Sequence, residues 1–374
     1  MVVESFIPVN APLLDGNEKK YLTECIDTGW VSSEGPFVKQ FEEQLAECVG
    51  RRYGIAVCNG TAALDAAIDA LGIGPGDEII LPTFTIISCV GQIVRIGAVP
   101  VLVESNPVTW NMDVDRIESR ITNRTKAIMV VHIYGLPVDM DPVIDIARRH
   151  GIKVIEDAAE MLGQTYKGRP CGSFGDVSNF SFYSNKHVTT GEGGMIVTDD
   201  ASLAETCRNL RNLCFQPHKR FVHERLGWNL RMTNLQAAIG IAQLERLDEF
   251  VARKRRMGRR YTELLSGLAG VQLPLERTEA AENIYWVYGL VLDEAIGFDA
   301  EEAMKRLDAK GIGTRPFFCP MHWQPVLKSM GFFMDERYPV AERLYRQGFY
   351  IPSGIAMTDD QMNRVAEAVI EVLR

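Results

Sequence analysis

The chain lacks the sequence features of a disulfide-stabilised, metal-binding or membrane-spanning protein. Its eight cysteines form no C-x-x-C pair, and its six histidines show no H-E-x-x-H motif or similar ligand spacing. We therefore expect reduced thiols, mostly in the core, and no structural metal. No apolar run approaches the roughly 20 residues of a membrane-spanning helix, and the first residues do not resemble a signal peptide. These absences predict a cytoplasmic protein that does not enter the membrane.

An excess of positive charge is also absent. The 374 residues include 40 Lys and Arg against 49 Asp and Glu, which gives a net charge of -9. This balance argues against nucleic acid or an anionic membrane as the main partner, although a local basic pocket for a phosphorylated ligand remains compatible with it. With 46% hydrophobic and 24% charged residues, the composition is that of a soluble globular protein of about two domains.

Strand-like apolar runs alternate with helical segments over the first half of the chain. The expected strands cover residues 53–58, 78–81, 98–103, 126–132 and 153–157, and the expected helices cover residues 15–27, 37–48, 86–96, 113–121, 140–150 and 201–212. This alternation predicts an α/β domain with a mostly parallel sheet and helices on both faces.

The second half of the chain has a different pattern. Apolar spacing from Leu235 predicts one long helix that runs to about Leu265 and leaves the large domain. The segments after it predict a smaller α+β domain. We expect a large domain over residues 1–248 and a small C-terminal domain over residues 249–374.

Three polar motifs lie at or just after the ends of expected strands. They are Asn59-Gly60-Thr61, Asp157 and Lys186. Because ligands of open parallel sheets bind at the carboxyl ends of the strands, these motifs can converge on one crevice. Asn59-Gly60-Thr61 opens a helix, where backbone N–H groups and a threonine hydroxyl would favour a phosphate. An ordinary N-cap explains the same three residues.

Lys186 lies in a loop rich in glycine and hydroxyl residues between two strand-like runs. A surface-loop lysine is one interpretation of this position. The other is a Schiff-base lysine, whose amine attacks an aldehyde once burial or a nearby cation has lowered its pKa. The same amine could move a proton to or from a substrate carbon.

Asp157 ends a buried strand, where an unpaired carboxylate is costly. A helix cap or an internal salt bridge would account for it. Alternatively, it pairs with a pyridinium nitrogen and keeps that ring an electron sink, while the small Ala159 lets the ring lie against the backbone. With Ser181 as a phosphate donor and Lys186 as the amine, these residues supply the anchors that pyridoxal 5'-phosphate (PLP) needs.

The chain resembles the DegT/DnrJ/EryC1/StrS family of sugar aminotransferases over nearly its whole length. The motifs that carry the resemblance are Gly29-Trp30-Val31-Ser32-Ser33, Asn59-Gly60-Thr61-Ala62-Ala63-Leu64, Glu156-Asp157-Ala158-Ala159, residues 181–194 and residues 227–247. The resemblance implies the aspartate aminotransferase-like fold type I of PLP-dependent transferases. It implies that Lys186 holds the cofactor, that Asp157 binds its ring nitrogen, and that Thr61, Ala62 and Ser181 bind its phosphate.

The resemblance also implies a homodimer with shared active sites, because Asn229 matches a residue that reaches the phosphate from the other subunit. Two positions depart from the family pattern. Glu160 stands where Gln or His is common near the cofactor's phenolic oxygen, so it is either protonated or directed elsewhere. Ile86 replaces an aromatic residue that stacks on the ring, so stacking is weaker or Phe84 contributes to it.

The reaction that the resemblance implies takes the amino group of L-glutamate and transfers it to C4 of a nucleotide-linked 4-keto-6-deoxy sugar for surface polysaccharide. The best substrate is GDP-4-keto-6-deoxymannose, and a dTDP- or UDP-keto sugar is the alternative. A PLP-dependent sugar dehydratase and a non-catalytic PLP-binding protein are rivals, and the presence of Lys186 disfavours both. Substrate-binding candidates, each of which could instead be a surface charge or a packing residue, are Trp30, Ser32, Lys219, Arg231 and Arg315.

Overall fold

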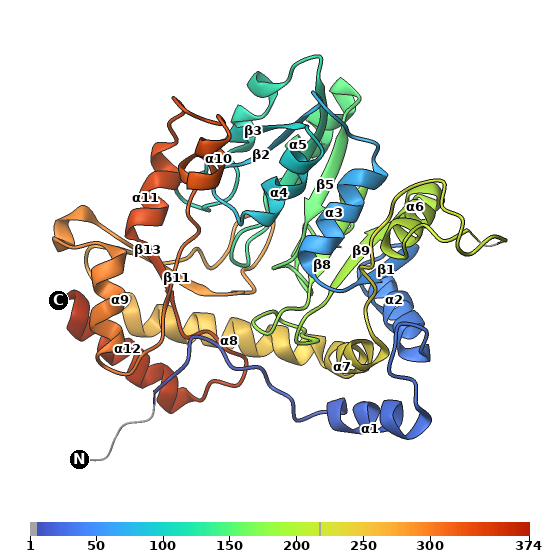
Figure 1. Ribbon diagram of the computed structural model, residues 1–374. Helices are drawn as coiled ribbons and strands as arrows, with labels where there is room; N and C mark the ends of the chain where they lie inside the picture. Colours follow the sequence, from blue (N-terminus) through green and yellow to red (C-terminus); the bar gives the residue numbers. More distant parts are fainter. Residues whose placement is uncertain (1–5, 217) are drawn as a thin grey trace.

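A seven-stranded sheet forms the centre of the large domain in the computed structural model, which describes residues 6–216 and 218–374 (Figure 1). Its strands are β1 (Tyr53–Val57), β2 (Glu78–Pro82), β3 (Val99–Val103), β4 (Thr125–Val131), β5 (Lys153–Asp157), β8 (Val177–Ser181) and β9 (Gly194–Thr198). They are ordered β1-β9-β8-β5-β4-β2-β3. Strand β9 is antiparallel to both of its neighbours and the other pairs are parallel, so the predicted mostly parallel sheet is confirmed.

Helices cover both faces of this sheet (Figure 1). One layer contains α3 (Gly60–Ala70), α4 (Ser88–Arg95) and α6 (Ala201–Arg211), and the other contains α2 (Pro36–Cys48), α5 (Met140–His150) and α7 (Asn234–Leu244). Alternate strand residues serve the two layers, since Ile79 and Leu81 pack in the first core and Ile80 packs in the second. Because both faces of the sheet are buried, side chains of both orientations are apolar, and the strands appear in the sequence as continuous apolar runs.

The C-terminal part has its own antiparallel sheet and core. The strands β10 (Val271–Gln272), β11 (Tyr288–Leu292), β13 (Gly348–Ile351) and β12 (Arg315–Pro316) lie in that order. They pack with α8 (Leu247–Leu265), α9 (Ala300–Asp308) and α12 (Asp359–Leu373). Near the other end of the chain, Ile7 pairs with Ile312 and belongs to this core. A division near residue 248, in the first turn of α8, stays a prediction.

The smaller elements connect these parts. They are α1 (Glu18–Thr28), η1 (Val114–Arg116), η2 (Glu118–Arg120), β6 (Thr165–Tyr166), β7 (Arg169–Pro170), η3 (Glu294–Ile296), η4 (Met321–Trp323), α10 (Pro325–Ser329) and α11 (Pro339–Gln347). No described helix is both long and apolar enough to cross a membrane.

Three predicted helices differ from the structure. The first begins at Glu18 and not at residue 15, with Asn17 as its N-cap residue, and Asp15 forms an ion pair with Arg246. Residues 113–121 form two short 3-10 turns, η1 and η2. The predicted single helix from Leu235 to Leu265 is two helices, α7 and α8, which are separated at residues 245–246. No Gly or Pro marks that break, and the apolar spacing continues across it. The sequence therefore gives no sign of it.

Candidate active site

A cavity of about 490 Å³ lies at the carboxyl ends of the central strands. The start of α3, the end of β5 and the end of β8 contribute its walls, as the topology of a parallel sheet requires. The wall residues that the sequence predicted are Thr61, Asp157, Ala159, Glu160, Ser181 and Lys186. Residues distant in sequence therefore do converge here.

Lys186 projects into this cavity from the loop between β8 and β9. Its Nζ lies 3.9 Å from the centroid of the Trp286 ring, and the Trp286 Nε1–H donates to the Asn185 carbonyl at 3.0 Å. Burial lowers the pKa of Lys186, while the nearby Glu160 and Asp157 carboxyls oppose that shift. A lowered pKa leaves more of the amine in the neutral form that can act as a nucleophile.

Asp157 is 4% exposed and has a donor on each oxygen. Its Oδ1 accepts from the Ala159 N–H and from Asn179 Nδ2, both at 3.0 Å, and its Oδ2 accepts from the Cys89 thiol at 3.3 Å. Asn179 pairs with Asp157 across the parallel strands β5 and β8. Neither the helix cap nor the salt bridge considered for Asp157 is present among the described residues.

Glu160 also faces the cavity, and its environment changes its protonation. Its Oε2 accepts from the Tyr134 N–H at 2.6 Å. Burial raises the pKa of Glu160 to about 8, and the nearby Asp157 carboxylate adds to the shift. Tyr134 has a φ of 59°, a strained backbone conformation that directs its N–H at Glu160. The Tyr134 N–H and the nearby Lys186 lower the pKa in part, but burial outweighs them, so of the two possibilities open from the sequence a protonated Glu160 is favoured.

The start of α3 and Ser181 form a small polar cradle. A Cβ on Gly60 would lie 2.8 Å from the Ser181 Cβ, so only glycine allows this approach. Asn59 is an N-cap, because its Oδ1 accepts from the Ala62 N–H at 2.8 Å. That bond uses the amide of Ala62, a buried residue that does not line the cavity, while Thr61 and Ser181 do line it. A helix N-terminus with two hydroxyls fits a phosphate group.

The remaining predicted residues lie outside the cavity of the single chain. Trp30 and Ser32 are exposed, and their carbonyls accept from Asn234 at 2.7 and 2.8 Å. Asn229 accepts from Arg231 Nε at 2.9 Å. Two further candidates, Lys219 and Arg315, are exposed. The cavity wall has three acidic side chains, Asp157, Glu160 and Glu192, and one lysine, Lys186. Within the described part of this chain it therefore has no cluster of cations for an anionic substrate.

Sequence reasoning missed the aromatic wall of the cavity. Trp286, Phe318 and Tyr350 come from the C-terminal part and surround Tyr134, with ring centroids 5.8, 5.4 and 6.2 Å from its own. The suggestion that Phe84 stacks in the site was wrong, because its side chain is fully buried beneath this wall. No local pattern could have identified the aromatic wall, since its members lie far in sequence from the strands of the large sheet whose ends form the cavity.

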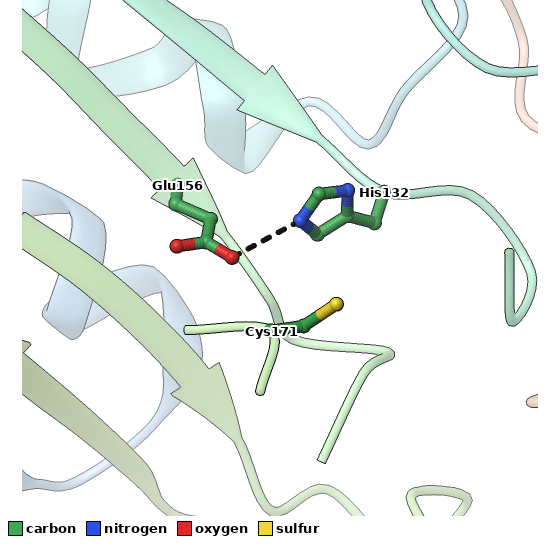
Figure 2. Close-up of side chains that lie close together, drawn as sticks. All are labelled: His132, Glu156 and Cys171. Carbon is green, nitrogen blue, oxygen red and sulfur yellow. Dashed lines mark hydrogen bonds and ion pairs between the residues drawn. The ribbon is translucent and has the colours of Figure 1, made fainter. Parts of the chain in front are cut away.

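One buried cluster beside the cavity has the composition of a metal site. Figure 2 shows His132, Glu156 and Cys171, with His132 Nε2 3.2 Å from Glu156 Oε1. His132 Nδ1 accepts from the Val138 N–H at 3.0 Å, so Nε2 carries the proton and donates to Glu156. Glu156 also accepts from Ser178 and from backbone amides, and burial raises the pKa of the Cys171 thiol well above its usual range. His132 and Glu156 are thus engaged with each other and with backbone amides, as in a structural hydrogen-bond network.

Known proteins resemble this chain along almost its full length. The sequence profile of the DegT/DnrJ/EryC1/StrS aminotransferase family matches residues 12–370. A GDP-perosamine synthase of Caulobacter vibrioides is 44% identical, and one of Escherichia coli O157:H7 is 41% identical, each over 98% of both chains. The PLP-form structure of Spr1654 from Streptococcus pneumoniae superposes with a TM-score of 0.91 and 26% identity, covering 98% of both chains.

Proposed function

The chain belongs to the DegT/DnrJ/EryC1/StrS aminotransferase family, and from this premise we propose that it converts GDP-4-keto-6-deoxymannose to GDP-perosamine with L-glutamate as amino donor. It is an aminotransferase with the fold type I of PLP-dependent transferases. The convergence of Lys186, Asp157 and the start of α3 on one cavity carries the proposal. The two synthases named above support the choice of a GDP-linked sugar.

The residues of the cavity fit PLP as the cofactor. Thr61, Ser181 and the start of α3 would hold its phosphate, and Asp157 would hold its ring nitrogen. Glu160, neutral below its pKa of about 8, would lie near the phenolic oxygen without repelling it. When bound, the cofactor supplies an electron-withdrawing ring that stabilises negative charge on a substrate carbon.

Lys186 would do the acid–base work of both half-reactions. With glutamate in the cavity, neutral Nζ would accept the proton of the α-carbon, while the amino group would pass to the cofactor and water would supply the carbonyl oxygen of 2-oxoglutarate. With the keto sugar in the cavity, Nζ would deliver a proton to C4, which would receive that amino group and lose its oxygen as water. The Trp286 ring against Nζ limits where the amine can point and keeps water from that side.

A partner subunit would supply what the single chain lacks. The segment that carries Lys219, Asn229 and Arg231 also exposes Phe221 and Leu226, at 81% and 91%. Exposed apolar side chains of this size are typical of a surface that another protein covers. A homodimer would bury them, bring Asn229 to the partner's phosphate cradle and bring cations to the acidic cavity.

A reducing compartment suits the chain, because all eight cysteines are free. This supports the prediction that the enzyme acts in the cytoplasm on a soluble nucleotide sugar.

Product analysis tests the proposed reaction. Protein supplied with PLP and L-glutamate should convert GDP-4-keto-6-deoxymannose to a product whose mass shows amine in place of ketone, with one 2-oxoglutarate per amine. Lys186→Ala should lose this activity by several orders of magnitude. Conversion of a dTDP- or UDP-keto sugar instead would show that the nucleotide is wrong. Release of ammonia, or a deoxy sugar formed without net amino transfer, would favour the dehydratase.

A further inference from the structure

Asn179 is a fully buried polar residue at the centre of β8, between Ser178 and Phe180. It is 1% exposed, and its side chain lies on the cavity wall. Its Nδ2 donates to Asp157 Oδ1 at 3.0 Å, whereas no described donor lies within hydrogen-bonding distance of its Oδ1. The amide cannot be reversed without placing two acceptors, its Oδ1 and the carboxylate, against each other. Its orientation is therefore set by Asp157.

An amide with one unsatisfied buried oxygen is costly to hold in a strand interior. A Val or Thr of similar width would suit the pleated, buried position better. Among the described residues, the one hydrogen bond of this side chain goes to Asp157, which indicates that this bond is the reason for the amide.

The donors of Asp157 are divided unequally between its two oxygens. Oδ1 receives two good N–H donors, from Asn179 and from the Ala159 backbone, both at 3.0 Å. Oδ2 receives only the Cys89 thiol, a weak donor at 3.3 Å. The carboxylate is thus fixed through Oδ1, and Oδ2 keeps most of its capacity to accept.

We propose that Asn179 is a positioning residue for Asp157: it anchors Oδ1 so that Oδ2 is presented to the ring nitrogen of the bound cofactor. This inference rests on the proposed function, because it takes PLP as the ligand. It concerns Asn179 alone, which acts through Asp157 and not through the reacting atoms.

Two ligands, the cofactor and one analogue of it, separate this role from a general effect on folding. One is PLP itself, and the other is its analogue with carbon in place of the ring nitrogen. Both carry the same phosphate and aldehyde, so they differ only in the group that Asp157 would bind. The affinity ratio of the two, measured by equilibrium titration of protein freed of cofactor, reports on the Asp157 contact. General damage to the fold or the phosphate cradle would weaken both ligands equally.

Asn179→Val and Asn179→Thr form a matched pair of nearly identical shape. Threonine keeps a hydroxyl donor, one bond shorter than the Asn179 amide, and valine has no donor. We expect Asn179→Val to lower the preference for PLP over the carbon analogue by about tenfold, the effect of losing one hydrogen bond to a charged group. Asn179→Thr should restore only part of that preference, because its hydroxyl lies one bond closer to the backbone than Asn179 Nδ2. Asn179→Ala, a second donor-free variant, should behave like Asn179→Val if the latter folds poorly.

The outcomes of this experiment are distinguishable. A wild-type preference for PLP that survives unchanged in Asn179→Val and Asn179→Ala would overturn the role of Asn179 and leave the proposed function intact. Failure of the wild-type protein to bind either compound would overturn the proposed cofactor and this inference with it. Equal wild-type affinity for both compounds would overturn the pairing of Asp157 with the ring nitrogen and, again, this inference.

Discussion

Burial in the cavity changes the protonation of Glu160. Its pKa of about 8 lies above the usual value because the carboxyl is buried, and its neutral form therefore predominates at neutral pH. As the pH rises through about 8, Glu160 ionises and gains a negative charge beside Asp157. A second carboxylate there would repel an electron-rich cofactor oxygen.

We predict that kcat/KM of the wild-type enzyme falls as the pH rises through about 8 and that Glu160→Gln reduces this fall. Glutamine keeps an oxygen for the Tyr134 N–H but cannot ionise. Rates measured from pH 6.5 to 9.5 for both proteins would test this. An identical alkaline limb in the two profiles would assign the titration to another group.

His187 is buried next to Lys186, and its Nε2 lies 3.1 Å from the Ile284 carbonyl. Burial, with Lys254 nearby, lowers the pKa of His187 to about 3. An unfolded histidine binds a proton near pH 6.5, so between these two values the unfolded chain holds more protons than the folded one. The contribution of His187 to the free energy of unfolding must therefore decrease as the pH falls from 6.5 to 3.

Replacing His187 by glutamine removes this titration while keeping a donor for the Ile284 carbonyl. We predict that His187→Gln loses less stability than the wild type on going from pH 6.5 to pH 4.5, by up to about 1.4 kcal/mol per pH unit. Urea unfolding of the cofactor-free proteins at several pH values measures the difference. Parallel losses in both proteins would show that other groups dominate acid unfolding.

At the scale of elements, α8 approaches the segment before β11 unusually closely. A Cβ on Gly258 of α8 would lie 2.3 Å from the ring of Tyr285, the residue before Trp286. Tyr285 is 1% exposed and has a φ of 49°, so it has little freedom to move. Glycine at residue 258 therefore lets α8 support the segment that brings Trp286 to Lys186.

We expect Gly258→Ala to lower the free energy of unfolding by about 1–3 kcal/mol, because the added methyl overpacks this contact. Gly91→Ala is a matched control inside a helix, α4, where the nearest atom to the new Cβ is the end of the Arg95 side chain at 3.5 Å. It should be stabilising by roughly 0.5–1 kcal/mol. A stabilised Gly258→Ala would show that the contact is looser than the structure has it.

The same scale shows what the sequence predicts well and what it does not. Alternating apolar runs predicted the parallel sheet, and the rule for strand ends then brought Thr61, Asp157 and Lys186 together. Local chemistry did not reveal the break between α7 and α8, since no helix breaker stands there. The aromatic wall and the state of Glu160 depend on burial by distant segments, which one sequence does not display.

At the scale of the whole molecule, the proposed homodimer makes each active site depend on two chains. If Lys186 comes from one subunit and Asn229 from its partner, two different inactive variants can complement each other. In a mixed dimer of Lys186→Ala and Asn229→Ala chains, one site would have both native residues and the other would have neither.

We predict that co-expression or subunit exchange of these variants restores roughly a quarter of the wild-type activity, since about half of the dimers are mixed and each has one native site. Each variant alone serves as the control, and sedimentation measures the oligomeric state. No recovery in a preparation proven to contain mixed dimers would contradict shared sites.

The proposed reaction requires that Lys186 binds the cofactor and that both half-reactions occur in one cavity. The most direct measurement is the visible absorbance spectrum of the protein supplied with PLP. It is recorded first alone, then after L-glutamate, and finally after GDP-4-keto-6-deoxymannose. Lys186→Ala is the matched control.

We predict a visible band in the wild-type protein that disappears with glutamate and returns with the keto sugar. Loss of the band without its return would retain the aminotransferase and exclude this sugar. If the wild-type spectrum with PLP is indistinguishable from that of Lys186→Ala and does not respond to glutamate, the central claim about Lys186 is wrong.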